Sequence, residues 1–401
     1  MKQKQVDEYI QLYRGNLLDD VIPFWIKNSL DKEFGGYFTC LARDGKVFDT
    51  DKFIWLQCRQ VWCFAMLYNN VEKKQEWLDI ALQGAQFLME KGHDDKGNWY
   101  FSLTREGQPL TQPYNIFSDC FATMAFGQLY QATNKKEYAD IATATFNNIL
   151  ARQENSKGVY NKAYPGTRPI QGFSLPMILS NLVIEVEHLL QPELVEETIQ
   201  NAINSVMKVF YQPDLGLILE NVSPEGNFVD SFEGRLLNPG HGIEAMWFIM
   251  DIGARSGDKT LIKKAVDITL STLEYGWDKE HGGIFYFMDV KNSSPQQLEW
   301  DQKLWWVHIE SMISLLKGYL YTDDERCWEW FLKVHEYTWE HFPDQEHGEW
   351  FGYLNREGKP LLTLKGGKWK GCFHVPRGLY QCWQTLQSIS EKHKDLTVQN
   401  N

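Results

Sequence analysis

A turn motif that returns at regular intervals is the feature that most constrains the fold of this chain. The motif surrounds glycine with acidic and aromatic residues, as in Asp31–Phe38 and Asp278–Phe287. Six copies occur at a period of roughly 60 residues, marked by Gly35, Gly97, Gly158, Gly216, Gly282 and Gly348. Repeats of this kind bury their apolar faces only against one another. The sequence therefore predicts one domain spanning residues 1–401, although this length would ordinarily suggest two.

The stretches between the turns have room for two helices each, at roughly 45 residues per stretch. Apolar residues recur at helical spacing after several turns, as in Ile243, Met246, Trp247 and Met250. Other helical segments, such as Glu325–Thr338, carry more charge and are expected on the outside.

Paired helices between six turns predict an all-α fold, the (α/α)6 barrel or toroid. An outer ring of helices would surround an inner ring, and the turns would form short β-hairpin loops at one end. An open superhelix of helix pairs is the alternative, but six units of similar length favour a closed ring.

The composition disfavours several classes of partner. A net charge of −13 argues against binding to nucleic acid or to an anionic membrane. The N-terminus has no apolar signal-peptide region, and no stretch approaches the roughly 18 apolar residues of a membrane span. The seven cysteines show no CxxC spacing, which fits a reducing compartment. We therefore expect a cytoplasmic protein.

Four polar residues follow their turn glycines at almost the same distance. Arg59, His241, His308 and His374 lie 24, 25, 26 and 26 residues after the preceding marker glycine. Residues at one phase of a closed repeat lie at one level of the ring. These four side chains are therefore expected to converge on one cavity.

Two of the four have a clear structural interpretation as well. Arg59 lies between Trp55 and Trp62 on an apolar helix face, where a structural salt bridge would also account for it. His308 borders the apolar face of its helix, where a buried, hydrogen-bonded core histidine is the usual finding.

The other two lie where helices begin. Asn238 is a plausible N-cap for the helix that carries His241 and, on the same face, Glu244. A histidine followed by glycine could also simply shape that helix start. His374 is expected in the loop before a helix opened by Pro376, since the residue before a proline favours extended backbone. A loop histidine has little core to fill, which favours a functional role.

Two histidines facing one cavity suit proton transfer near neutral pH. Placed on opposite sides of a carbon acid, they could remove a proton from one face and return one to the other. A nearby arginine would stabilise the enolate oxygen formed in between. The residues alone therefore predict stereoinversion or isomerisation beside a carbonyl group. No His, Cys or Asp group has zinc-like spacing, so no metal site is expected.

Three segments that carry these residues resemble the N-acylglucosamine 2-epimerase family. They are Asn238–Glu244, Lys303–Glu310 and Gly371–Leu379. The layout and length are similar over nearly the whole chain. The resemblance implies reversible interconversion of N-acetyl-D-glucosamine and N-acetyl-D-mannosamine at C2.

The resemblance also implies roles for individual residues. His241 and His374 would be the two acid/base groups at C2, with the assignment of each to one face left open. Arg59 would stabilise the enolate formed from the open-chain aldehyde. Glu244 and Glu310 would orient or tune the histidines.

Further contacts are expected around this group. By the resemblance, His308 would assist ring opening or bind O1 or O5 of the sugar. The residues expected to bind the sugar are Trp55, Trp62, Asp119, Lys303, Trp305, Trp306 and Arg377. Family resemblance also implies a homodimer and activation by ATP without hydrolysis, although no nucleotide motif stands out in the sequence.

Other functions fit parts of the pattern. Cellobiose 2-epimerases and aldose–ketose isomerases share the barrel and equivalents of His241, His374 and Arg59. An inverting glycoside hydrolase on this fold would need two carboxylates, such as Glu244 and Glu310 or Asp119. A non-catalytic binding protein is the remaining alternative.

Overall fold

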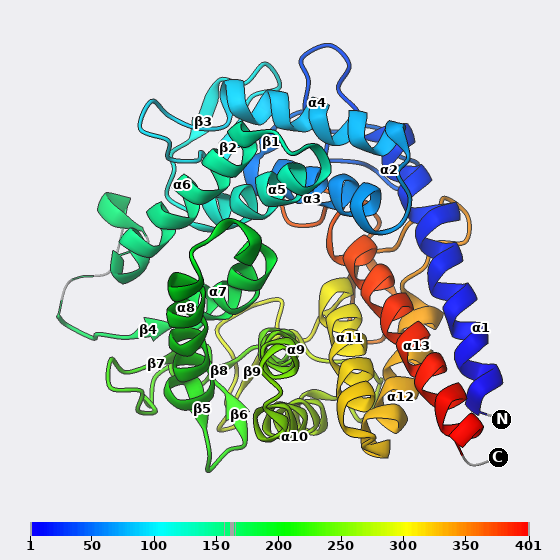
Figure 1. Cartoon of the computed structure of the whole chain (residues 1–401). Coiled ribbons are helices and arrows are strands. Elements are labelled where there is room, and N and C mark those ends of the chain that lie inside the picture. Colours follow the sequence, from blue (N-terminus) through cyan, green and yellow to red (C-terminus); the bar gives the residue numbers. More distant parts are fainter. Residues whose placement is uncertain (1, 156, 161–163, 165, 400–401) are drawn as a thin grey trace.

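The helices form two concentric rings around a central axis, as the computed structural model shows for residues 2–155, 157–160, 164 and 166–399 (Figure 1). The inner ring contains α3 (Ile54–Asn70), α5 (Phe117–Thr133), α7 (Ser174–Glu185), α9 (Pro239–Ser256), α11 (Trp305–Thr322) and α13 (His374–Gln399). The outer ring contains α1 (Lys2–Gly15), α4 (Gln75–Lys91), α6 (Lys136–Arg152), α8 (Pro192–Asn204), α10 (Lys259–Gly276) and α12 (Glu325–His341). The predicted (α/α)6 barrel is confirmed, and the open superhelix is wrong.

The two ends of the chain meet in this ring. The outer partner of α13 is α1, and the N- and C-termini lie side by side in Figure 1. A short helix, α2 (Ile22–Asn28), follows α1 and leads to the first turn. The first and last segments of the sequence therefore complete one unit together.

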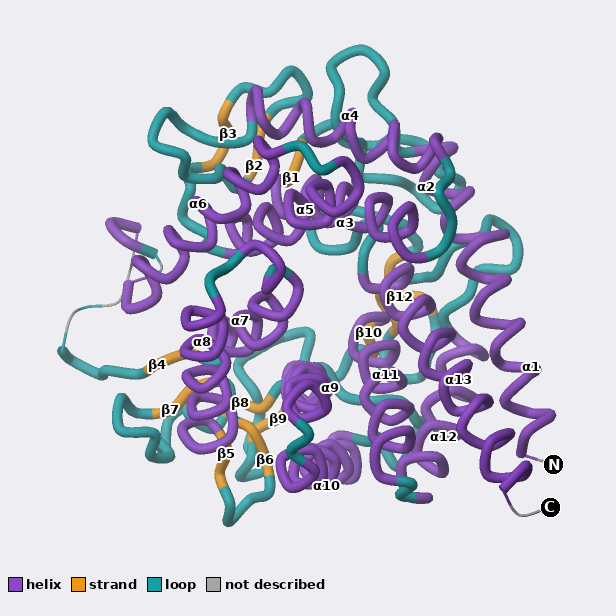
Figure 2. The backbone as a smooth tube through the Cα atoms, in the orientation of Figure 1, coloured by secondary structure: helices purple, strands orange, loops and turns teal. Residues whose placement is uncertain are grey.

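The strands are short and lie in the loops between helices (Figure 2). They are β1 (Lys52–Phe53), β2 (Ser102–Leu103), β3 (Pro109–Thr111), β4 (Gln171–Gly172), β5 (Tyr211–Gln212), β6 (Leu217–Ile218), β7 (Asn221–Val222), β8 (Leu236–Leu237), β9 (Met288–Asp289), β10 (Lys303–Leu304), β11 (Tyr353–Leu354) and β12 (Pro360–Leu362). The strand that enters an inner helix pairs with the hairpin of the next unit, as β1 does with β2, β8 with β9 and β10 with β11. This pairing links the hairpins around one end of the barrel.

The structure confirms the predicted cap of α9 but not the predicted start of α13. Asn238 caps α9 as predicted, its side chain accepting a hydrogen bond from the His241 amide at 3.1 Å. At α13 the helix begins at His374, so the prediction that this residue lies in a loop is wrong. Pro376 falls inside the first turn, where the missing amide proton has no helical partner to lose.

A buried ion cluster with the same three parts recurs at three turns. Its parts are the turn aspartate, a lysine that precedes the next inner helix, and an arginine from the hairpin of the following unit. The clusters are Asp31–Lys52–Arg105, Asp278–Lys303–Arg356 and Asp344–Lys365–Arg43, with N–O distances of 2.8 to 3.0 Å. The third cluster joins the last unit to the first, so the ring is closed by the same contact that joins units within it.

The barrel core is apolar and continuous between the two rings. Among the described residues, no helix is long and apolar enough to cross a membrane.

Replacing Asp344 by Asn should destabilise the closed ring. The change removes the carboxylate that pairs with buried Lys365 at 2.8 Å and leaves that ammonium group without this ion pair. Breaking a buried ion pair from one side costs about 3–5 kcal/mol. The urea midpoint of unfolding, followed by circular dichroism, should fall accordingly. The control is Asp214→Asn at an exposed turn position, and an equal midpoint in the two variants would contradict the prediction.

Candidate active site

The inner helices and hairpin loops enclose a cavity of about 530 Å³. Most of its wall is aromatic, including Trp55, Phe121, Trp305 and Trp306. The charged and titratable groups that reach it, tyrosines aside, are Arg59, His241, Glu244, Glu299, His374 and Arg377. A cavity of this size with a few converging polar groups is typical of a small-molecule site.

His241 is held by a carboxylate that sequence reasoning missed. The side chain sits in the first turn of α9, and its Nδ1 lies 3.0 Å from both carboxylate oxygens of Glu220. The ring packs 5.2 Å from Trp306. Because Nδ1 is engaged, Nε2 is the nitrogen left to meet a ligand in the cavity.

His374 has a matching arrangement on the neighbouring side of the cavity. Its Nδ1 lies 2.8 Å from Glu310 Oε1, and Glu310 is fully buried. Glu310 also accepts hydrogen bonds from Arg377 at 2.6 Å and from the Trp247 indole at 3.0 Å. Arg377 in turn donates to Glu244 at 2.5 Å. The carboxylate behind His374 is therefore already paired with a guanidinium, which it shares with Glu244.

The pKa values of the two histidines are consequently shifted in opposite directions. Burial would lower the pKa of His241, but the charge of Glu220 and its hydrogen bonds outweigh burial, so that the pKa is raised. Burial, followed by the positive charge of Arg59, lowers the pKa of His374 well below its usual value. One imidazole favours the protonated form and the other the neutral form, which is the arrangement needed by an acid and a base.

Arg59 reaches the cavity inside an aromatic box. Its guanidinium carbon lies 4.3 Å from the Trp55 ring, 3.9 Å from Phe121 and 4.6 Å from Phe373. Burial, followed by repulsion from Arg377, lowers its pKa to about 9. Within the described chain it forms neither an ion pair nor a hydrogen bond, and its Nε is buried without a partner. The structural salt bridge is therefore wrong, and the donors of Arg59 are free for a ligand oxygen.

The sequence profile of the family described as N-acylglucosamine 2-epimerase (GlcNAc 2-epimerase) matches residues 36–376. The chain belongs to this family. It is 40% identical over 396 residues to an N-acylglucosamine 2-epimerase of Rattus norvegicus, covering 96% of this chain and 94% of the rat protein. A cellobiose 2-epimerase of Dictyoglomus turgidum is 24% identical over 398 residues, covering 93% and 97%. The solved cellobiose 2-epimerase from Bacillus thermoamylovorans shares the fold, with a TM-score of 0.81 and 21% identity over 94% of this chain and 99% of that one. The protein is accordingly an isomerase of the epimerase type.

Several residues predicted to act in this epimerase do line its cavity. They are Trp55, Arg59, His241, Glu244, Trp305, Trp306, His374 and Arg377. Glu310 lies directly behind His374. Glu244 contacts Arg377 rather than His241, whose carboxylate partner is Glu220.

Three predicted sugar contacts lie elsewhere in the structure. The Trp62 indole donates to Glu185 at 3.0 Å. Asp119 pairs with Arg152 at 2.9 Å. Lys303 is fully buried in the ion cluster around Asp278. Each side chain has a structural partner, and none lines the cavity.

His308 is also turned away from the cavity. Its Nε2 accepts a hydrogen bond from the Ile284 amide at 3.0 Å, which places the proton on Nδ1, 2.7 Å from the Leu304 carbonyl oxygen. Its ring stacks on Tyr337 at 5.2 Å, and burial lowers its pKa to about 3. His308 therefore has the surroundings of a buried, hydrogen-bonded core histidine. Equal spacing from a glycine does not give equal rotation, because His308 is the fourth residue of α11 whereas His374 is the first of α13.

Glu244, Glu310 and His374 form a cluster of possible metal ligands. Their ligand atoms lie within 4.8 Å of one another, which is close enough to surround a metal ion. The Arg377 guanidinium bonds to both carboxylates and already supplies the positive charge there. The two carboxylates therefore fit the Arg377 guanidinium better than a metal ion.

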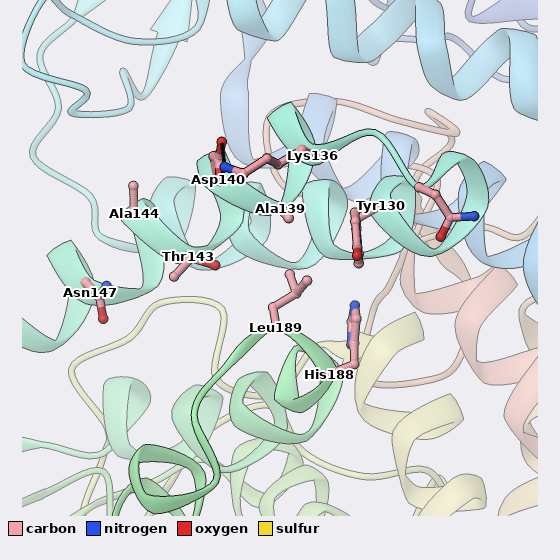
Figure 3. A pocket seen from close by; sticks show the side chains of 10 residues that line it. Tyr130, Lys136, Ala139, Asp140, Thr143, Ala144, Asn147, His188 and Leu189 are labelled. Carbon is pink, nitrogen blue, oxygen red and sulfur yellow. Dashed lines mark hydrogen bonds and ion pairs between the residues drawn. The ribbon is translucent and has the colours of Figure 1, made fainter.

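A second hollow lies on the outside of the barrel, beside α6 and the Glu187–Leu189 turn (Figure 3). It is open and measures about 590 Å³. The charged residues Lys136 and Asp140 on its rim pair with each other at 2.6 Å, and His188 stacks on Tyr130. It lacks the converging acid–base groups of the central cavity.

Replacing His308 by Ala should lower stability rather than change the chemistry. The buried Ile284 amide and Leu304 carbonyl would lose their partner, at a cost of about 1–3 kcal/mol. Thermal unfolding should shift to lower temperature, while the pH dependence of turnover keeps its shape. His347→Ala, at a partly exposed turn position, is the control. An unchanged unfolding temperature with lost turnover would instead place His308 in the reaction.

Proposed function

We propose that the protein interconverts N-acetyl-D-glucosamine and N-acetyl-D-mannosamine, with one histidine removing the C2 proton and a second histidine donating a proton to the other face of C2. The observation that carries the proposal is a pair of imidazoles lining one cavity, each with Nδ1 held by a carboxylate. Relatives at about 40% identity carry the N-acylglucosamine 2-epimerase name, which supports the substrate class.

The reaction needs the open-chain aldehyde, in which C2–H is acidified by the C1 carbonyl. One neutral imidazole takes the C2 proton, and the electron pair forms the C1–C2 double bond with negative charge on O1. The opposite imidazolium then gives its proton to the other face of C2, and the C1 carbonyl forms again. The number of protons on the pair is unchanged, because one histidine gains what the other loses.

The charges in the cavity favour one order of events. His374 begins neutral, since burial and Arg59 disfavour its charged form, and acts as the base. His241 begins protonated, because Glu220 favours its charged form, and acts as the acid. Arg59, with free donors, would bind the oxygen that carries the enolate charge. The reverse reaction starts from the opposite protonation of the same pair.

The alternatives fit this cavity less well. An inverting hydrolase needs a carboxylate acid and a carboxylate base with room for water between them. Here Glu244 and Glu310 are both bonded to the same nitrogen of Arg377, and Asp119 lies outside the cavity. A cellobiose 2-epimerase is favoured less because the named relative of that type is only 24% identical.

The proposal includes a nucleotide effector and a homodimer, both suggested by the family resemblance. ATP would raise turnover without being consumed. Adding ATP to the assay below and measuring mass by light scattering test these two points.

Proton NMR of the protein with N-acetyl-D-mannosamine in D₂O, with and without ATP, tests the central proposal. N-acetyl-D-glucosamine carrying deuterium at C2 should accumulate, because the donated proton comes from a histidine that exchanges with solvent. His241→Asn and His374→Asn should each lose roughly 10²–10⁴-fold in turnover. Epimerisation with C2–H fully retained would contradict the proton-transfer route. Turnover of cellobiose, mannose or glucose instead would overturn the substrate assignment.

The pH dependence of kcat/KM should be bell-shaped with a plateau through neutrality. Activity should fall in acid as His374, whose pKa is lowered, becomes protonated. It should fall again in alkali as His241, whose pKa is raised, loses its proton. Both limbs report the coupled pair, so each midpoint belongs to the pair rather than to one residue. A profile without an acidic limb would argue against a histidine base.

A further inference from the structure

We propose that Glu220 is the positioning residue for His241, holding Nδ1 so that Nε2 faces the sugar. This inference rests on the proposed function and adds a residue to it. Glu220 does not line the cavity and is separated from His241 by 21 residues. It acts through the imidazole rather than by touching the substrate.

Backbone hydrogen bonds fix the place of Glu220. The residue follows β6, and its amide donates to the Leu236 carbonyl at 3.2 Å. Its own carbonyl accepts from the Phe173 amide at 2.9 Å. Leu236 begins the strand that leads through the Asn238 cap into α9. The carboxylate and the histidine are therefore set in register by the same short segment of backbone.

The contact itself selects one orientation of the ring. Both oxygens of Glu220 lie 3.0 Å from Nδ1, and a carboxylate can only accept, so Nδ1 must carry a proton. The Glu220 side chain is 11% exposed, which limits competition from water. Rotating the ring by half a turn would break both contacts.

Glu220 differs from Glu310, its counterpart behind His374, in one respect. Glu310 is shared with the Arg377 guanidinium, whereas no lysine or arginine in the described chain pairs with Glu220. The full negative charge of Glu220 therefore acts on His241. The two dyads share their geometry and differ in net charge.

The other groups that face His241 do not replace Glu220. Glu244, on the same helix, adds a weaker negative charge and is bonded to Arg377. His374 lies across the cavity and has its own carboxylate. Trp306 contacts the ring. Glu299 and Tyr286 also line the cavity, and Tyr286 holds its proton because burial raises its pKa. Glu220 is thus the main source of both orientation and charge.

The repeat shows how unusual this residue is. Glu220 lies four residues after its marker glycine, and the same position holds Thr39, Phe101, Tyr286 and Gly352 at other turns. The Gly158 copy has Lys162 at this position, so Glu220 is the single acidic residue among the six copies of the repeat.

The test combines histidine NMR with kinetics on the full chain. Carbon-13 labelling of the imidazole Cε1, with His241→Asn to identify the signal, gives the titration midpoint of His241. In Glu220→Gln the midpoint should fall by about 1–3 pH units, because the charge is lost while the shape is kept. The alkaline limb of the kcat/KM profile should move to lower pH with it. We expect kcat to fall roughly 10²-fold with KM little changed.

Two further variants separate this role from a general structural one. Glu220→Asp keeps the charge and should recover part of kcat and of the titration midpoint. Glu225→Gln makes the same change at an exposed position five residues along and should match the wild type in both. Urea midpoints of all variants exclude unfolding as the cause of a loss.

Each outcome bears on a different part of the proposal. An unchanged His241 midpoint in Glu220→Gln would overturn it, whatever the activity. A lowered midpoint with wild-type kcat would overturn the positioning role in catalysis. If the wild type converts neither sugar, the proposed function fails, while the titration still decides whether Glu220 controls His241.

Discussion

Buried aspartates at three of the turns tie a hairpin to the neighbouring unit, and the active-site end of the barrel depends on them. Each aspartate binds a lysine from its own unit and an arginine from the next, at 2.8 to 3.0 Å. A charge removed from water needs such partners to be tolerated. The loops around the cavity are thereby tied to one another. Lys303, predicted to bind sugar, serves this frame instead.

Within that frame, two carboxylate–histidine pairs of similar geometry are given different charges. Arg377 offsets part of the negative charge of Glu244 and Glu310 on one side, and Glu220 keeps its full charge on the other. A single cavity can therefore hold one acid and one base near neutral pH. The aromatic box around Arg59 keeps a third charged group free of competing carboxylates.

Much of this was predictable from the sequence, and the errors have physical causes. The repeat predicts the ring, and Asn238 predicts the start of α9, because both depend on local residue order. Spacing alone groups His308 with the other histidines. His308 lies three positions further into its helix than His374 does, however, and this rotates its side chain to another face. Glu220 was missed because its partner lies 21 residues away, on an element whose placement requires the assembled barrel. The start of α13 at His374 was missed because proline was treated as the first helical residue.

The meeting of α1 with α13 has a consequence for how the protein is made. The helix α1 packs against α13, so α1 is synthesised long before its partner, as Arg43 is before Asp344. Tyr13 likewise finds its partner, His335, 322 residues later. The units between α1 and α13 can assemble in chain order, but α1 lacks its partner in the ring until α13 has been synthesised. Ring closure is therefore a late step in folding, which follows the synthesis of α13.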